Sequence, residues 1–185
     1  MSFLGHPFIF TPVVALVVGW RVLQPEEALL GVLTIVVACL FPMAVYIYRK
    51  VHKGEWSNLD VSARKDRPHL FVVGVCFLVI ACLALYLTHQ SPAFLRGCTA
   101  AIALVGAAWS LNFWLKPSMH AGFAMLTSFS LWSLGARIAF PLALFAILVG
   151  WSRIVLVRHT KLEVLVGLLL GAIVARVFSF PKRLM

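Results

Sequence analysis

The stretch "LFVVGVCFLVIACLALYL", residues Leu70–Leu87, runs for 18 residues without a charged side chain. A helix needs roughly 20 predominantly apolar residues to cross the hydrocarbon core of a bilayer. With its flanking residues the stretch is therefore long enough to do so, and it predicts a transmembrane helix over residues 69–88. Because of this helix, we expect the whole protein to be an integral membrane protein.

Runs of the same kind recur along the chain and are separated by short polar breaks. The seven predicted spans are 7–23, 28–49, 69–88, 94–115, 118–134, 138–156 and 160–179. The runs 94–115 and 118–134 form either two full spans or one span and a re-entrant piece. The sequence therefore predicts an all-α fold, a polytopic transmembrane helical bundle of six to seven spans.

The composition excludes a soluble protein of this length. Of the 185 residues, 62% are hydrophobic and 12% are charged. A soluble fold leaves too much surface exposed to hide that many apolar side chains. We expect one integral membrane domain over residues 1–185. The N-terminal stretch "MSFLGHPFIF" has no basic region ahead of its apolar run, which favours a first span over a removable signal peptide.

The charge is strongly basic, with 16 Lys and Arg against 6 Asp and Glu. Basic loops of membrane proteins usually mark the cytoplasmic side and contact anionic headgroups, and a site for an anionic substrate is the alternative. Nucleic acid is not an expected partner, because no soluble basic surface exists to bind it. The four cysteines lie in apolar runs without metal-ligand spacing and are expected to be core residues: Cys39, Cys76, Cys82 and Cys98.

Alternating spans gather the unusual polar residues on one side of the membrane. With seven spans, the loop 49–68, the break near Lys116 and the segment 152–160 all fall on this side, which we call the polar face. It carries Arg64, Arg67, Lys116, Ser118, His120, Arg153, His159 and Glu163. Ionisable groups within a membrane protein are costly and mark functional sites. His6 precedes the first span on the same face, where an interfacial role is favoured over contact with the site.

The segment "SRIVLVRHTKLEV", residues 152–164, places His159 and Glu163 four positions apart. On a helix these side chains share a face, so the carboxylate can fix the tautomer of the imidazole. Arg153 precedes them and can bind a phosphate through two parallel hydrogen bonds. The alternative is a solvated ion pair at a surface helix end.

The segment "KPSMHAGF", residues 116–123, has the features of a helix start. Pro117 is favoured in a first turn, and the free N–H groups there suit an anion that His120 can also reach. An interfacial histidine beside a capped helix is the alternative. In "DVSARKDRPHL", Arg64 and Arg67 share a helix face, and contact with lipid headgroups is their alternative role.

Taken in the order in which they occur along the chain, these three segments resemble the motifs of the type 2 phosphatidic acid phosphatase (PAP2) superfamily. The family motifs are Lys-x6-Arg-Pro, Pro-Ser-Gly-His and Ser-Arg-x5-His-x3-Asp. The third is similar here at Ser152, Arg153 and His159, with Glu163 in place of the Asp. Glu keeps the carboxylate and lengthens its reach, so it can still orient the histidine.

The other two motifs resemble the family less closely. The second is present as Pro117, Ser118 and His120, with Met119 in place of the Gly. The first is similar only at Arg67 and Pro68, because Asp60 occupies the position of the Lys. We hypothesise that Arg64, one turn before Arg67, supplies the missing positive charge.

The resemblance implies a PAP2-like helical core and hydrolysis of phosphate esters without a metal or other cofactor. His159 would attack phosphorus, Glu163 would orient it, and His120 would protonate the leaving alkoxide. The groups expected to hold the phosphate are Arg67, Arg153, Ser118, Arg64, Ser152, Met119 through its backbone N–H, and Lys116.

The membrane setting predicts a substrate whose tail stays in lipid, either a lipid phosphate or a polyprenyl mono- or diphosphate. Alternatives are a non-catalytic protein that binds or transports phospholipid and a lipid phosphotransferase of the same fold. We expect the protein in the cell membrane of a bacterium or archaeon, in contact with membrane lipids. Ten of the 16 Lys and Arg fall on the polar face, which favours its cytoplasmic orientation. The sequence predicts no oligomeric state.

Overall fold

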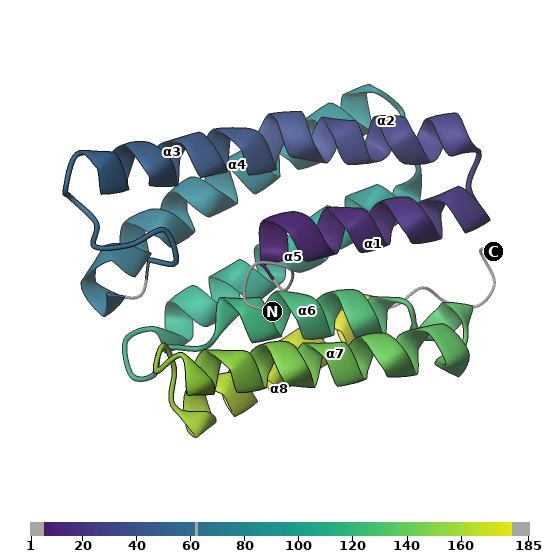
Figure 1. Ribbon diagram of the computed structural model, residues 1–185. Helices are drawn as coiled ribbons and strands as arrows, with labels where there is room; N and C mark the ends of the chain where they lie inside the picture. The colour runs from purple at the N-terminus through teal and green to yellow at the C-terminus, as the bar shows by residue number, and fades with distance from the viewer. Residues whose placement is uncertain (1–5, 62, 179–185) are drawn as a thin grey trace. The chain divides into compact units, whose positions relative to one another are not determined.

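The computed structural model describes residues 6–61 and 63–178, and the regular secondary structure of these residues is helical throughout. This confirms the all-α prediction (Figure 1). The elements are α1 (Pro7–Val22), α2 (Pro25–Ile35), η1 (Val36–Leu40), α3 (Phe41–His52), η2 (Arg64–Asp66), α4 (Arg67–Leu87), α5 (Pro92–Leu111), α6 (Met119–Ser130), η3 (Trp132–Leu134), α7 (Ala136–Val155) and α8 (Lys161–Phe178). The sequence predicts a first span and no removable signal peptide at the N-terminus, and residues 1–5 of that stretch lie outside the described residues.

The predicted apolar runs coincide with helical segments of the structure. The predicted span 28–49 corresponds to α2, η1 and α3 together, because these three elements follow one another without a break. Among residues 6–61 and 63–178, four helical segments are long and apolar enough to cross a membrane: Pro25–His52, Arg64–Leu87, Pro92–Leu111 and Ala136–Val155. They support a membrane protein. The helix α1 is a shorter apolar helix, and α6 has 12 residues, fewer than the roughly 20 that span a bilayer core. The exact number of spans stays a prediction.

Proline sets several local features of these helices. It stands in the first turn of α2, α4 and α5, where its missing N–H removes no intrahelical bond. Within the continuous helix formed by α2, η1 and α3, the Phe41 N–H donates to the Val36 carbonyl oxygen, which gives the wider π-helical turn of η1. Pro42 follows at once, and the wider turn accommodates a residue that cannot donate to the helix.

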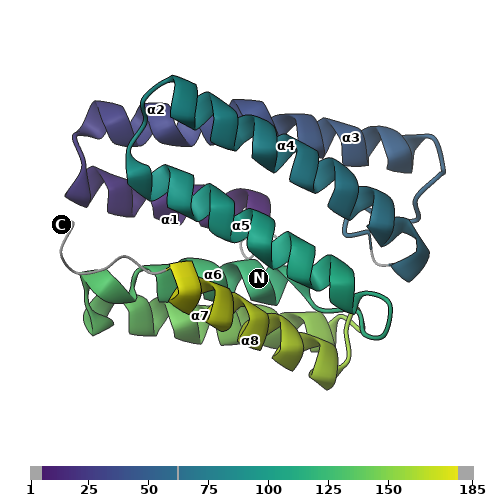
Figure 2. The same ribbon diagram turned by 180° about the vertical axis from the view of Figure 1, so that it is seen from behind.

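The described chain divides into two compact units. The second unit consists of residues 15–61 and 63–112, and in it α4 packs against α5, α2 and η1 (Figure 2). The Phe94 ring lies against Gly31 so closely that a Cβ on that glycine would come within 2.2 Å of it. The prediction of a single domain over residues 1–185 stays a prediction.

The first unit consists of residues 6–14 and 113–178, and its centre is α6, which packs against both α7 and α8. The first turns of α1 belong to the same core, because Phe10 stacks on Phe145 with ring centroids 5.0 Å apart. The Thr11 and Thr127 hydroxyls also lie 3.3 Å apart in hydrogen-bond geometry. Close packing here needs glycine: a Cβ on Gly171 would come within 2.2 Å of the Gly122 carbonyl oxygen.

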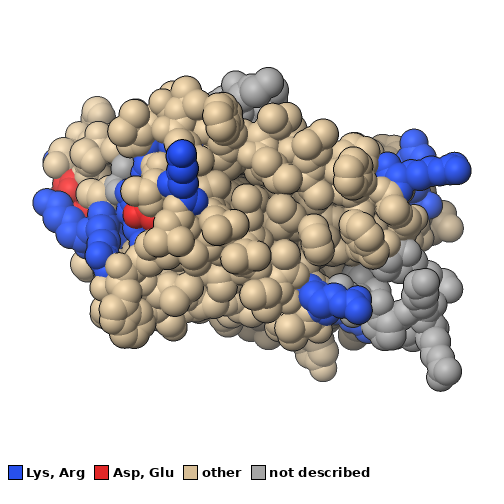
Figure 3. Space-filling view, turned by 90° about the horizontal axis from the view of Figure 1, so that it is seen from below, with Lys and Arg blue, Asp and Glu red and all other residues tan. Residues whose placement is uncertain are grey.

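Most of the surface visible in Figure 3 is made of uncharged side chains, and few Lys and Arg side chains lie on it. An uncharged surface suits contact with hydrocarbon, because a charged side chain is costly at the centre of a bilayer.

Candidate functional site

His159 and Glu163 form a hydrogen-bonded pair at the start of α8. The Nδ1 atom of His159 lies 3.1 Å from the Oε2 atom of Glu163, so the pairing expected from their spacing is present. The His159 side chain is 4% exposed and that of Glu163 is 15% exposed. An ionised carboxylate can only accept, so Nδ1 carries the proton in this pair and Nε2 keeps its lone pair.

The same carboxylate also caps α8, a role that the sequence analysis missed. Glu163 Oε2 accepts a 2.9 Å hydrogen bond from the Thr160 N–H, and the Glu163 N–H donates to Thr160 Oγ1 at 3.2 Å. This is the reciprocal capping box, and the Thr-x-x-Glu spacing was its sequence signal. One oxygen of Glu163 therefore serves the helix start and the histidine together.

Arg153 lies near the end of α7 and is 1% exposed. Its carbonyl oxygen accepts hydrogen bonds from the N–H groups of Arg158, at 3.0 Å, and of His159, at 3.3 Å. The turn between α7 and α8 thus folds back on the residue that carries the guanidinium. Its neighbour Ser152 donates its hydroxyl to the Val149 carbonyl at 2.7 Å, which leaves the oxygen lone pairs of Ser152 but not its proton for a ligand.

Ser118 connects the start of α6 to the start of α8. Its N–H donates to the Glu163 carbonyl at 3.0 Å, and a Cβ on Gly167 would come within 2.5 Å of the Ser118 carbonyl oxygen. The Ser118 side chain is fully buried, and its Oγ has no hydrogen-bond partner among residues 6–61 and 63–178. A buried hydroxyl in this state costs about 1–3 kcal/mol, so the position suits a ligand that completes the bond.

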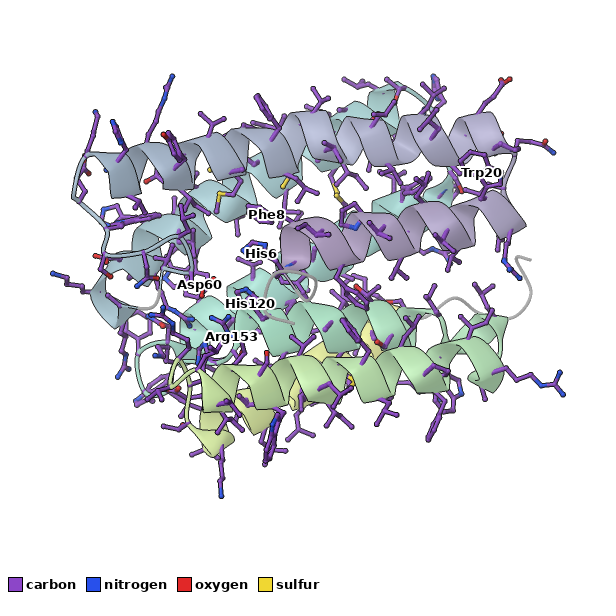
Figure 4. All side chains as sticks on the ribbon, viewed as in Figure 1. His6, Phe8, Trp20, Asp60, His120 and Arg153 are labelled. Atoms are coloured by element: carbon purple, nitrogen blue, oxygen red, sulfur yellow. The ribbon has the colours of Figure 1, made fainter. Side chains whose placement is uncertain are left out.

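His120 follows in the first turn of α6 and is 8% exposed. Met119, the residue between Ser118 and His120, is the first residue of that helix. The His120 ring packs against the ring of His6, with centroids 4.9 Å apart and planes at 89° (Figure 4). The sequence favoured an interfacial role for His6, and its contact with a motif residue more than 100 positions away gave no sequence signal.

Lys116 points to the neighbouring loop. Its Nζ donates to the Arg158 carbonyl at 3.0 Å, so the ammonium joins the loop before α6 to the loop before α8. The phosphate-binding role expected for Lys116 stays a prediction beside this structural one.

Arg64 and Arg67 belong to the second unit and are described there alone. The Arg64 Nε donates to the Asn112 carbonyl at 2.7 Å. Arg67 is the first residue of α4 and is buried. The structure thus brings together the second-motif and third-motif residues within the first unit. The expectation that these two arginines join them stays a prediction.

A comparison with protein-family models bears on the same residues. The model of the PAP2 superfamily matches residues 67–182, which is more than half of the chain. The matched range contains Arg67 and the second and third motifs, and both His6 and Arg64 precede it. No match to this chain was found among curated proteins or among solved structures. The family supports a phosphatase-type function in general terms, and the apolar helices support a membrane protein. The chain belongs to the PAP2 superfamily.

Proposed function

We propose that this protein is a membrane-embedded phosphatase that hydrolyses a lipid phosphate or polyprenyl phosphate through a phosphohistidine on His159, without a metal ion. The observation that carries the proposal is the bond between His159 Nδ1 and Glu163 Oε2. It leaves the lone pair of His159 Nε2 for nucleophilic attack, in a unit that also buries Arg153 and His120. This arrangement supports a nucleophile oriented by a carboxylate.

In the first step, Nε2 of His159 forms a bond to phosphorus while the bond from phosphorus to the ester oxygen breaks. The leaving alkoxide takes a proton from His120, which lowers the barrier because an alkoxide is a poor leaving group. The positive charge that develops on the phosphorylated imidazole is stabilised by the Glu163 carboxylate, which accepts from Nδ1 throughout.

In the second step, water attacks the phosphohistidine and the bond from nitrogen to phosphorus breaks. His120, neutral after the first step, takes the proton of the attacking water. Inorganic phosphate leaves, and His159 regains the lone pair on Nε2. Both histidines then have their starting protonation states, so the cycle is balanced.

The equatorial phosphate oxygens require donors fixed before the reaction. The Arg153 guanidinium provides up to two parallel hydrogen bonds, and the Ser118 hydroxyl provides one more. Because both side chains are buried, they need little reorganisation when the charge on phosphate redistributes. The family motif adds Arg67 and the Met119 backbone N–H to this set.

A lipid substrate is supported by the surroundings of these residues. Near the motifs in sequence, the first unit exposes large apolar side chains, and Val157, in the turn before His159, is 89% exposed. Trp151 and Leu162, on either side of that turn, are exposed as well. These side chains suit hydrocarbon or the membrane interface, where a substrate with an apolar tail presents its phosphate. The Lys and Arg of the polar face support a cytoplasmic orientation.

The test is phosphate release by the purified protein in detergent with EDTA, over a panel of lipid phosphates and polyprenyl mono- and diphosphates. Release that persists with EDTA and is lost in His159→Ala supports the proposal. Rapid alkaline quenching with a radiolabelled substrate should trap an acid-labile phosphoenzyme in the wild type but not in His159→Ala. The matched control is His89→Asn, which changes an exposed histidine in the second unit and should keep wild-type activity.

Each of the other outcomes points to one alternative. Binding of a lipid phosphate without turnover supports a carrier or regulatory protein that keeps the fold. Transfer of phosphate to an added alcohol in preference to water supports a phosphotransferase. Turnover that requires an added metal ion overturns the mechanism given above.

A further inference from the structure

His6 begins α1 as its capping residue. Its carbonyl oxygen accepts hydrogen bonds from the N–H groups of Ile9 and Phe10, both at 2.9 Å. Its ring Nδ1 accepts from the Phe8 N–H at 3.3 Å. Because Nδ1 accepts this bond, the proton of the neutral His6 ring is on Nε2. The cap therefore fixes both the tautomer and the orientation of the ring.

The helix that carries His6 is itself anchored in the first unit. Phe10 stacks on Phe145 of α7, and Thr11 meets Thr127 of α6. These contacts hold the first turns of α1 against the helix that also carries His120. These contacts with α6 and α7 therefore set the position of the first turn of α1, which His6 caps.

The His6 ring meets the His120 ring edge to face, 4.9 Å between centroids, and it contacts the Phe8 ring on another side, also at 4.9 Å. Figure 4 shows His6 and His120 adjacent, with Phe8 beside them. Rotation of a histidine ring about its last side-chain bond is broad unless neighbours restrict it. An edge-to-face contact with a fixed ring supplies that restriction.

A general acid must hold its donor nitrogen within hydrogen-bond reach of the leaving oxygen. We propose that His6 is a positioning residue that holds the His120 ring in the orientation needed for proton transfer. The inference rests on the function proposed above for His120. It adds a residue that lies outside the three motifs and outside the matched residues 67–182.

Two substitutions separate this role from helix capping. His6→Asn keeps a side-chain acceptor that suits a helix cap but removes the ring. His6→Phe keeps an aromatic ring but removes the acceptor. If the ring positions His120, the Asn variant is impaired and the Phe variant is spared. If His6 only caps α1, the order is reversed and the proposal is overturned.

The readout is the dependence of turnover on the leaving group. Each variant is assayed with an alkyl phosphate monoester of a lipid and with an aryl phosphate monoester, whose phenolate leaves with little protonation. We expect His6→Asn to lower kcat on the alkyl substrate by roughly tenfold or more, and on the aryl substrate by less than about threefold. Equal losses on both substrates indicate a general structural defect and overturn the proposal. In a His120→Ala background, His6→Asn should have no further effect.

A second readout does not require turnover. Diethyl pyrocarbonate modifies accessible imidazoles, and mass spectrometry follows the peptide that contains His120. We expect its modification to be several-fold faster in His6→Asn than in the wild type and in His6→Phe. Equal rates in all three proteins overturn the proposal. If the wild type hydrolyses neither substrate, the proposed function fails, and this measurement still decides whether His6 holds His120. His89→Asn is the matched control in both assays.

Discussion

The Ser118 N–H donates to the Glu163 carbonyl oxygen at 3.0 Å. This main-chain bond joins the segment that carries His120 to the helix that orients His159. No side chain takes part in it, so the two parts of the site keep their connection whichever residue occupies either position, proline at 118 excepted. Close approach of α8 is the condition for the bond, and that condition can be tested.

Gly167→Ala should separate the two segments. The added Cβ would meet the Ser118 carbonyl oxygen at 2.5 Å, and a backbone atom cannot move aside as a side chain can. We expect a loss of stability of about 1–3 kcal/mol, from thermal unfolding in detergent, with a loss of phosphate release. Gly97→Ala is the control, since nothing lies within 4 Å of its added Cβ. Wild-type stability in the Gly167 variant would contradict the close packing.

Glu163→Gln should keep the cap and lose the charge. An amide oxygen in this place can still accept from the Thr160 N–H and from His159 Nδ1, but without a charge it no longer stabilises a positive imidazole. We expect kcat to fall by roughly a hundredfold or more, while the unfolding temperature changes little. Activity close to that of the wild type would show that the carboxylate charge has no part in the reaction.

Glu163→Asp should be impaired although Asp is the family residue at this place. In the wild type, a single oxygen of Glu163 accepts from both His159 and the Thr160 N–H. The Asp side chain is one methylene shorter and cannot reach both partners as well. We expect a fall in kcat together with a loss of up to about 1 kcal/mol in stability. The control is Thr160→Val, which removes only the hydroxyl bond to the Glu163 N–H and should reduce stability alone. Full activity in the Asp variant would mean that the double role is dispensable.

Lys116→Met tests whether this ammonium binds phosphate or the loop. Its bond to the Arg158 carbonyl predicts a lower unfolding temperature with a KM within about twofold of the wild-type value. Arg153→Lys, in contrast, should raise KM and lower kcat, because a point charge cannot replace a two-bonded guanidinium. Lys161→Met, at an exposed position of α8, is the matched control. A large rise in KM for Lys116→Met would restore the phosphate role expected from the sequence.

The loop after α3 offers a pH-dependent ion pair away from these residues. The hydrogen bond from Lys50 to Glu55 lowers the pKa of the Glu55 carboxyl below its ordinary value. A lowered carboxyl pKa stabilises the fold above the ordinary carboxyl pKa, and this contribution disappears as the pH falls through the lowered value. Lys50→Met should raise the pKa of Glu55 towards normal in an NMR titration of its carboxyl carbon. An unchanged titration would contradict the pair.

The helices could be predicted from sequence more fully than the site. Hydrophobic runs mark helices directly, so each predicted span has a counterpart among α1 to α8. Their length was less certain, because η3 continues the apolar run after α6 without being α-helical. The pairing of His159 with Glu163 depended on local spacing alone, and it was correct.

What the sequence did not reveal depended on contacts between distant segments. His6 meets His120 only because Phe10 and Thr11 dock α1 onto other helices, and no local pattern encodes that docking. The bond from Lys116 to the Arg158 carbonyl likewise joins two loops 42 residues apart. The spacing of Thr160 and Glu163 is that of a capping box, but from the sequence we assigned Glu163 only to the orientation of His159 and so did not predict the cap.

The docking of α1 also has a consequence for biosynthesis. Thr11 and Thr127 are 116 positions apart, so a ribosome releases the first turns of α1 long before it has made their neighbours in α6 and α7. During that interval these turns lack the side chains of α6 and α7 against which they pack, and contacts of such long range form late. A nascent chain halted before α6 cannot bring His6 to its partner ring. The first unit can therefore assemble only after α6 and α7 have been synthesised.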